Sequence, residues 1–215
     1  MAWTADELYG RDGAFLDGLD ARKEAFVVEV PPNAQPWLTK PKVLKKPPQN
    51  AAGRPKKPPR LSQRDRQPSE VQNLAKYSPV LRQQTPQRYG IKQTHHGSEA
   101  WEIRWATCWR KTHTGELVSN QCTLIVARNV LTGEIKYFLS NRVPGRDGWS
   151  LRKILRVAFG RWPIKDCFRE AKEELGLDHF ECCGWRCIHR HLFITILRQL
   201  FCACVRRSFH EAKTP

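Results

Sequence analysis

Acidic side chains are scarce in this sequence. Only 21 Asp and Glu stand against 37 Lys and Arg, which gives a formal net charge of +16 and a pI near 9.8. A chain so short of negative charge does not suit a basic partner and favours a polyanionic one, most simply nucleic acid. Charge alone does not separate DNA from RNA or from a membrane surface.

The sequence also lacks a secretory leader, because its N-terminus is acidic and has no apolar core region. The most apolar run, residues 191–205, is interrupted by Arg198 and Gln199 and is too short to span a bilayer. The eight cysteines show no disulfide framework spacing. These features predict a cytoplasmic protein with reduced cysteines and no membrane partner.

Residues 1–30 differ in character from the rest of the chain. They carry seven acidic and three basic side chains, and they predict a strand end at Asp6, a short helix, and a buried strand over residues 25–30. The order strand, helix, strand favours a parallel sheet in an α/β fold.

Residues 31–100 form a basic, proline-rich segment with fourteen basic and three acidic side chains. A segment with so few aliphatic residues buries too little apolar surface to offset its ordering entropy. Two interpretations stay open with equal weight, a solvated linker and a basic arm that follows a DNA backbone.

Residues 101–148 predict a β-rich insertion, because apolar and polar residues alternate along them. The expected strands are residues 101–110, 121–128 and 134–139, and the last two are joined by a hairpin at Gly133. Trp101, Trp105 and Trp109 share one side of the first strand. Core packing is the favoured role for these rings, and base stacking is the alternative.

Residues 149–208 predict the C-terminal helices. Ser150 can cap a helix that ends at Gly160. A second helix opens near Pro163 and stops at Gly176, and a third runs from about residue 188 to 205.

Two stretches together resemble the DDE transposases of the insertion-sequence-four family. One is Trp3 to Gly10, and the other is the helical stretch of residues 161–192 with its Gly-Leu-Asp-His-Phe-Glu segment. The family's third acidic residue lies in the pattern Tyr-x2-Arg-x3-Glu-x6-Lys, which falls here on Ala158, Arg161, Lys165 and Lys172. The Arg and the final Lys fit the pattern, whereas the Tyr and the Glu do not.

The resemblance implies a partial RNase H-like fold and a metal-dependent chemistry. Asp6 takes the position of the second acidic residue, a ligand of Mg²⁺ or Mn²⁺ that assists DNA strand cleavage and transfer. The first acidic residue would lie on a strand before Asp6, but the sequence starts only five residues earlier. Lys165 puts a positive charge where the third carboxylate should be. Asp166 is the nearest substitute, but it is turned about 100° around the helix.

The resemblance also implies DNA contacts. Arg161 and Lys172 match basic residues near the family's active site, and Arg190 matches an Arg at the start of its last helix. The expected partners are DNA at transposon ends and an intact transposase with which this chain would associate.

A zinc site is the alternative for the C-terminal part. His179, Cys182, Cys183, Cys187, His189 and His191 fall within thirteen residues. Zinc favours thiolate and imidazole ligands, but the spacing matches no common zinc knuckle. Packed cysteines are the favoured interpretation.

The sequence thus predicts a truncated, inactive DDE transposase whose ancestor carried out DNA transposition. The alternatives are a DNA-binding or regulatory module without catalysis and a zinc-dependent interaction protein.

Overall fold

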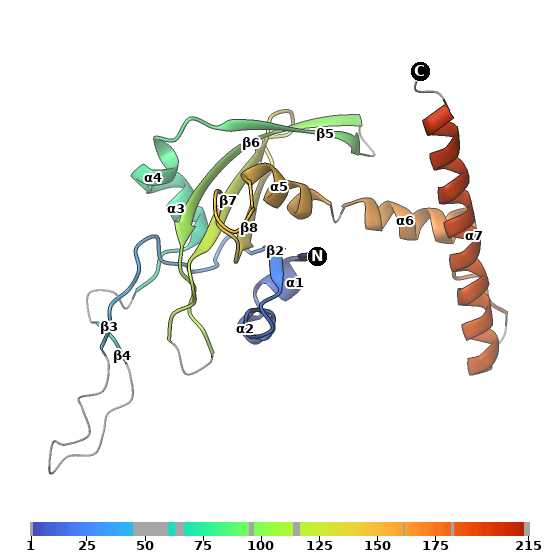
Figure 1. Ribbon diagram of the computed structural model, residues 1–215, viewed down its shortest axis with the longest axis horizontal. Coiled ribbons are helices and arrows are strands. Elements are labelled where there is room, and N and C mark those ends of the chain that lie inside the picture. Colours follow the sequence, from blue (N-terminus) through green and yellow to red (C-terminus); the bar gives the residue numbers. More distant parts are fainter. Residues whose placement is uncertain are drawn as a thin grey trace, which may run out of the picture. The chain divides into compact units, whose positions relative to one another are not determined.

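A six-stranded mixed sheet organises the first part of the chain (Figure 1). The computed structural model describes residues 2–44, 60–62, 67–94, 97–113, 117–160, 162–181 and 183–212. It divides the chain into two compact units, residues 1–161 and 162–215. The sheet lies in the first unit and two helices make up the second.

The sheet has the strand order β1-β2-β8-β7-β6-β5. Its strands are β1 Ala2–Ala5, β2 Ala25–Glu29, β5 Gln87–Thr94, β6 Gly97–Cys108, β7 Cys122–Asn129 and β8 Ile135–Ser140. Only β1 and β2 pair in parallel, and every other neighbouring pair is antiparallel. The fold is therefore mixed α/β, consistent with the RNase H-like class that the sequence predicts.

The parallel pair forms as the sequence predicts. Two helices, α1 (Glu7–Gly10) and α2 (Gly13–Ala21), connect β1 to β2. The Asp12 carboxylate caps α2 by accepting hydrogen bonds from the amides of Ala14 and Phe15, at 2.9 and 3.1 Å. The first four residues of β2 are buried, which explains why an unbroken apolar run, and not an alternating one, marks this strand.

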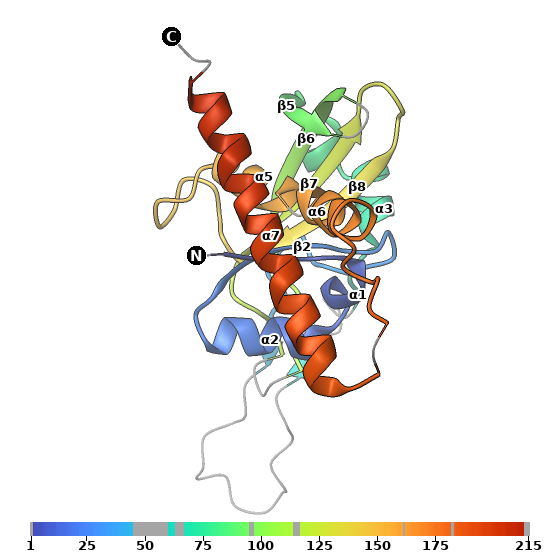
Figure 2. The ribbon, with the colours of Figure 1, turned by 90° about the vertical axis from the view of Figure 1, so that its right-hand side faces the viewer.

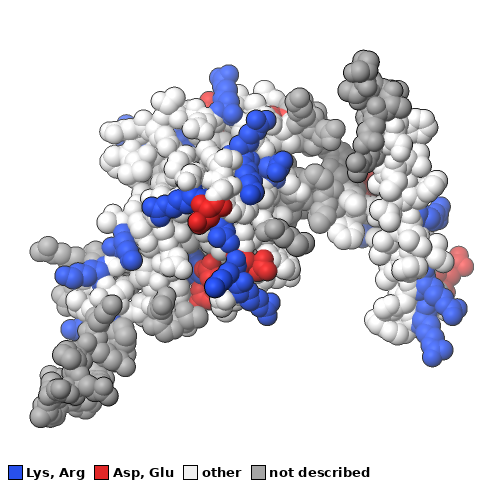
Figure 3. Space-filling view, viewed as in Figure 1, with Lys and Arg blue, Asp and Glu red and all other residues white. Residues whose placement is uncertain are grey.

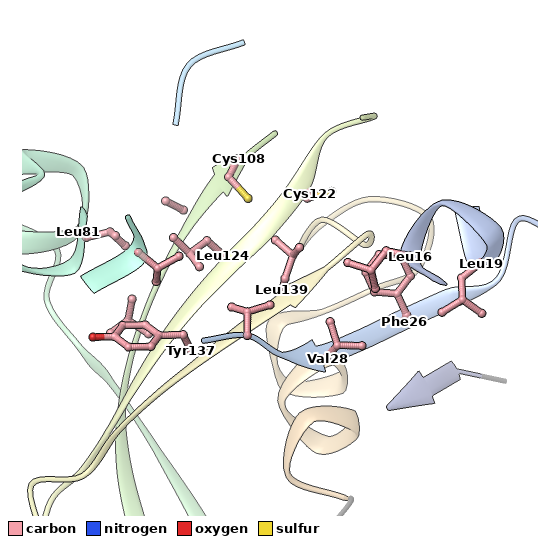
Figure 4. Close-up of a cluster of buried hydrophobic side chains, with 14 residues drawn as sticks. Leu16, Leu19, Phe26, Val28, Leu81, Cys108, Cys122, Leu124, Tyr137 and Leu139 are labelled. Atoms are coloured by element: carbon pink, nitrogen blue, oxygen red, sulfur yellow. The ribbon is translucent and has the colours of Figure 1, made fainter. Parts of the chain in front are cut away.

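Helices cover both faces of the sheet. On one face, which we call the α2 face, Leu16 and Leu19 of α2 pack with Phe26, Leu124 and Leu139 of the strands (Figure 4). Two further helices supply buried side chains to the same cluster, α3 (Val71–Tyr77) and α4 (Pro79–Arg82).

The opposite face, the α5 face, is covered by α5 (Leu151–Phe159). The ring of Phe159 lies 5.2 Å from that of Trp101 and 5.3 Å from that of Phe138, measured between ring centroids. Trp101 is fully buried, so it has the core role that the sequence analysis favours. Trp105 and Trp109 are partly buried.

The elements of the fold do not follow the four-part division of the chain that composition suggests. Residues 31–100 contribute Val71 and Leu81 to the core, and both are completely buried. They also hold a two-stranded sheet of β3 (Val43–Leu44) and β4 (Arg60–Leu61). The strands expected as an insertion, β6, β7 and β8, continue the sheet that β1 and β2 begin, because β8 pairs with β2.

The second unit contains α6 (Trp162–Glu173) and α7 (Trp185–Ala212) (Figure 2). Gly176 follows α6 with φ +70°, and the Leu177 amide donates to the Ala171 carbonyl at 2.8 Å, as in a glycine-terminated helix. The side-chain amide of Gln199 on α7 donates to the Cys167 carbonyl on α6 at 2.7 Å. Polar side chains thus help to join the two helices.

Apolar side chains of α7 are exposed within this unit, among them Phe193, Ile196, Leu200 and Phe201. The helix extends well beyond the expected run of residues 191–205. By length and composition alone, its residues 185–206 could cross a bilayer, a property that core helices of soluble proteins share. The expectation that this region is too short to do so therefore does not hold for the helix as it forms.

Gly10 is expected to be indispensable for packing, whereas Gly18 is not. A Cβ at Gly10 would collide with the backbone carbonyl oxygen of Glu29, but one at Gly18, inside α2, meets no atom within 4 Å. We expect Gly10→Ala to lower the free energy of unfolding by about 1–3 kcal/mol. The matched control Gly18→Ala should raise it by about 0.5–1 kcal/mol. Urea unfolding followed by circular dichroism measures both, and equal stabilities would contradict this packing.

Cys108 and Cys122 should resist thiol reagents in the native protein. They face each other across β6 and β7 and are buried. Burial raises the pKa of the Cys108 thiol well above its usual range and that of Cys122 from 9.0 to about 11. Mass spectrometry after alkylation at about pH 8, close to the pKa of an exposed thiol, should find Cys187 and Cys202 modified and the buried pair protected until urea is added.

The same pKa shifts predict a loss of stability in alkali. Because the folded-state pKa values of the two thiols are raised, the unfolded chain ionises first. Their contribution is complete below the unfolded pKa and is lost as pH rises from about 9 towards 11. The urea midpoint should fall over that range. In a Cys108→Ala, Cys122→Ala double variant, the part of that fall due to these thiols should disappear.

Candidate functional site

Asp6 lies where the parallel strands end. It follows β1 directly and begins α1, with its carbonyl oxygen accepting from the Gly10 amide at 2.8 Å. The residue is partly buried. Since β1 and β2 are parallel, their carboxyl ends meet at the same edge of the sheet, which is where α/β sheets place ligands. The expected position of Asp6 at the end of a parallel strand is thus confirmed, whereas its role as a ligand stays a prediction.

A buried ion network lies behind this edge on the α2 face. The Arg110 guanidinium contacts the carboxylates of Asp17 at 2.5 Å and Asp20 at 2.6 Å. Burial by itself lowers the pKa of Arg110, but the hydrogen bonds to Asp20 and Asp17 outweigh that effect and leave the pKa raised. Arg110 is therefore a permanent cation inside the first unit.

The network joins residues that lie far apart in the first unit's chain. The second oxygen of Asp17 accepts from the His113 backbone amide at 2.7 Å. Asp20 accepts from the Asn141 side-chain amide at 2.8 Å, and the Asn141 oxygen accepts from the Phe26 amide at 2.9 Å. One connected set of hydrogen bonds thus joins α2, the start of β2, the end of β8 and the segment after β6.

A cationic helix face lies on the other side of the sheet. Ser150 caps α5 by accepting from the Lys153 amide at 3.2 Å, as the sequence predicts. The helix buries Ile154, Leu155, Ala158 and Phe159 and exposes Arg152, Lys153 and Arg156. Lys and Arg side chains gather on this side of the unit in Figure 3.

The neighbouring strand extends this positive surface. A cavity of about 330 Å³ separates β5 from α5, and both Arg88 and Arg152 line it. The Lys153 ammonium lies 4.4 Å from the ring centroid of Trp149, which favours one orientation for its long side chain. We call Arg88, Arg152, Lys153 and Arg156 the α5 basic surface.

The basic residues expected from the family pattern are distributed over the second unit and the junction before it. Arg161 lies outside the described residues. The backbone of Lys165 is helical within α6, but its side chain and that of Asp166 are also outside the described part. Lys172 is exposed and lies 4.0 Å from Asp178, and Arg190 is exposed on α7.

The histidines of the cysteine and histidine cluster make other contacts, whereas Cys183 and Cys187 are free and exposed. His191 Nε2 lies 2.7 Å from the Gly176 carbonyl oxygen, and the His189 ring packs edge-on against Trp185 at 4.2 Å between ring centroids. His179 lies 3.8 Å from an Asp178 carboxylate oxygen, and Cys182 is outside the described residues. The hydrogen bond of His191 agrees with the interpretation that it is a structural residue.

Sequence reasoning missed the α5 basic surface and the buried Arg110. A signal for the first was present, because residues 141–161 contain six basic side chains and one acidic side chain, and Ser150, the helix cap, lies among them. No pattern in the neighbouring sequence could have identified Arg110 as a buried ion pair, because its two carboxylate partners lie 90 or more residues away.

Comparison with known proteins gives one family. Residues 2–99, just under half of the chain, match the DDE superfamily endonucleases. The match includes Asp6, β1, β2 and the basic segment with α3, α4 and β5. No curated protein matches the chain.

Removal of the Arg110 side chain should destabilise the protein, because the carboxylates of Asp17 and Asp20 would lose their counterion. We expect Arg110→Ala to lower the free energy of unfolding by about 3–5 kcal/mol, the usual result of breaking a buried ion pair from one side. Arg128→Ala, which removes an exposed positive charge from β7, should change stability by less than about 0.5 kcal/mol. Denaturant unfolding of both variants checks this, and similar values for the two would contradict a structural role for Arg110.

Proposed function

We propose that this chain binds DNA as part of a transposase of the insertion-sequence-four kind, because residues 2–99 match the DDE superfamily endonucleases. The observation that carries the proposal is the position of Asp6 within the matching residues, at the shared carboxyl edge of β1 and β2. The reaction in question is DNA transposition, in which strands are cut and joined by phosphoryl transfer.

Asp6 is the residue that would hold a divalent metal. A carboxylate oxygen is the ligand type that Mg²⁺ and Mn²⁺ prefer, so the residue fits the ion in kind. When bound, such an ion stabilises the charge that develops on the phosphoryl oxygens. The chain's own contribution at this edge is to fix the Asp6 backbone through α1 and to keep the carboxylate partly shielded from water.

The α5 basic surface would hold the DNA backbone. Three of its four cations stand on one helix whose opposite side is buried in the sheet, so their spacing is fixed by a rigid element. No acidic residue occurs in α5 to oppose a phosphate. The fourteen basic side chains of residues 31–100 add to the same positive field.

We further propose that this chain does not cut DNA by itself. Lys165 stands where the family pattern has its third carboxylate, and an ammonium group there opposes the metal ions that a carboxylate would attract. The chain would then act by binding DNA, or by associating with an intact transposase at transposon ends. Both roles use the α5 basic surface, and neither requires catalysis by Asp6.

DNA binding should depend steeply on salt. Arg152→Ala, Lys153→Ala and Arg156→Ala together remove three phosphate contacts, which should reduce the slope of log affinity against log salt by about 2–3. The control replaces three exposed arginines on other elements, Arg22, Arg128 and Arg169, by alanine, and removes the same net charge. Fluorescence anisotropy with a labelled duplex measures both variants. A slope that is unchanged by the first variant, or reduced equally by the second, would exclude the α5 basic surface as the DNA site.

Strand cleavage by the purified chain should stay at background. A supercoiled plasmid incubated with the protein and Mg²⁺ or Mn²⁺ at about 1 mM, a concentration at which weak divalent sites fill, reports nicking directly. Nicking that Asp6→Asn abolishes would overturn the proposed inactivity and would confirm Asp6 as a catalytic residue. The variant Lys165→Glu tests whether the lysine is the obstacle, since activity gained by this change alone would assign the block to it.

A further inference from the structure

The second unit buries very little apolar surface of its own. Among its described residues, Ala171 is the only apolar side chain that is buried, and Thr195 is the only buried polar one. A pair of helices with so small a core gains little stability from burial, and association with another chain is one way in which small folds obtain more. The outer surface of α7 shows where such an association would form.

One side of α7 faces α6 and is held by polar contacts. His191 Nε2 lies 2.7 Å from the Gly176 carbonyl oxygen, and the Gln199 side-chain amide donates to the Cys167 carbonyl at 2.7 Å. Thr195 lies midway between His191 and Gln199 and is 2% exposed. Residues four apart lie along one side of a helix, so these three positions define the side that faces α6.

The opposite side of α7 is apolar and exposed. At about 100° per residue, the helix turns six large apolar side chains away from the side of Thr195. Their exposed fractions lie between 48 and 69%, and we call them the α7 apolar side: Phe193, Ile194, Ile196, Leu197, Leu200 and Phe201. Arg198 is the only charged residue within residues 192–205, and the same spacing puts it at the margin of this side.

The α7 apolar side is large enough for a stable protein interface. Each of its six residues presents on the order of 100 Å² to solvent, so two such sides in contact would bury about 1,200 Å² in total. Specific protein–protein interfaces begin at about this size. Exposed apolar patches of several hundred Å² on a protein surface mark interaction sites, so this side needs a partner that is itself apolar.

The first unit has no comparable surface to offer. Both faces of its sheet are covered by helices of the same unit, α2 on one face and α5 on the other. Among the described residues of the six-stranded sheet, only Trp3 and Ile135 are large apolar side chains that are exposed. A second copy of the chain, by contrast, brings an identical apolar side.

A lipid bilayer is also a poorer partner than a second copy. The side of α7 that carries Thr195 and Gln199 is bonded to α6, and α6 exposes Arg169 and Glu173. Hydrocarbon offers no partner for these polar and charged groups, so α7 would have to separate from α6 before it could enter a membrane. Contact with another α7 leaves the bonds between α6 and α7 in place.

We propose that two copies of this chain associate through the α7 apolar side, with the six residues of one copy packed against the same six of the other. A two-fold contact of this kind uses the same surface on both partners and closes after two copies. Helices α6 and α7 of both copies then share one apolar core, as the helices of a four-helix bundle do. The inference concerns the second unit and does not rest on the proposed DNA binding.

Sedimentation velocity of the full chain without DNA tests the proposal. The mass of the particle should rise with concentration to twice the 25.0 kDa of one chain and no further. The double variant Leu197→Gln, Phe201→Gln should weaken association by about thirtyfold or more, because polar groups replace two apolar side chains of the interface. The matched control Val80→Gln, Leu131→Gln changes two exposed apolar side chains of the first unit and should dimerise like the unchanged chain.

A conservative variant separates loss of the interface from a disturbed helix. Leu197→Met with Phe201→Leu keeps this side of α7 apolar and should dimerise like the unchanged chain. Circular dichroism compares the helix content of all variants. Failure of the conservative variant to dimerise would contradict an interface that depends on apolar contact.

Three results would overturn the proposal: a chain that stays monomeric at every concentration, a dimer that persists in the Gln double variant, and assemblies that grow beyond two copies. If the chain is monomeric, two further measurements identify what covers α7 instead. Binding to vesicles of phosphatidylglycerol and phosphatidylcholine that the Gln double variant loses would assign the α7 apolar side to lipid. A lower thermal midpoint of that variant would assign it to a contact within the chain.

Failure of this interface and failure of the proposed DNA binding give different results. The variant Arg152→Ala, Lys153→Ala, Arg156→Ala should dimerise like the unchanged chain while it loses affinity for duplex DNA. The Gln double variant of α7 should be monomeric and keep the salt dependence of DNA binding by a single copy. Loss of dimerisation in the first variant would contradict an interface confined to α7.

Discussion

The ion pair network of Arg110 with Asp17 and Asp20 is the contact on which the first unit depends. It fastens α2 to the segment that follows β6, two parts of the chain separated by 90 or more residues. A buried guanidinium is stable only while both carboxylates surround it, so helix and segment must come together as one arrangement. Because Asp17 also accepts from the His113 amide, the same network holds the segment after β6 at a second point.

The parallel pairing of β1 and β2 is the second constraint. It brings the carboxyl ends of both strands to one edge, so that Asp6, Gly10 and Val30 lie around the same end of the sheet. The two faces of the sheet differ in the side chains that they carry. The α2 face carries the apolar cluster and the ion network, whereas the α5 face exposes Arg152, Lys153 and Arg156 to solvent.

Positive charge in this protein is therefore of two kinds. Arg110 is buried, paired and structural, while Arg152, Lys153 and Arg156 are exposed on a helix without acidic neighbours in it. The first kind holds the fold together, and the second lies at the surface, where the proposed DNA binding would use it.

Local patterns in the sequence determined the strands near residues 25–30, 121–128 and 134–139 and the helix that Ser150 caps, because alternation and capping act over a few residues. They also predicted that Asp6 ends a parallel strand, because a strand-helix-strand order favours parallel pairing. Only the tertiary structure decided that β8 pairs with β2 and that Val71, from a segment rich in proline and lysine, enters the core. Periodicity shows that a face is buried but not what covers it, and that choice depends on contacts between residues far apart in the chain.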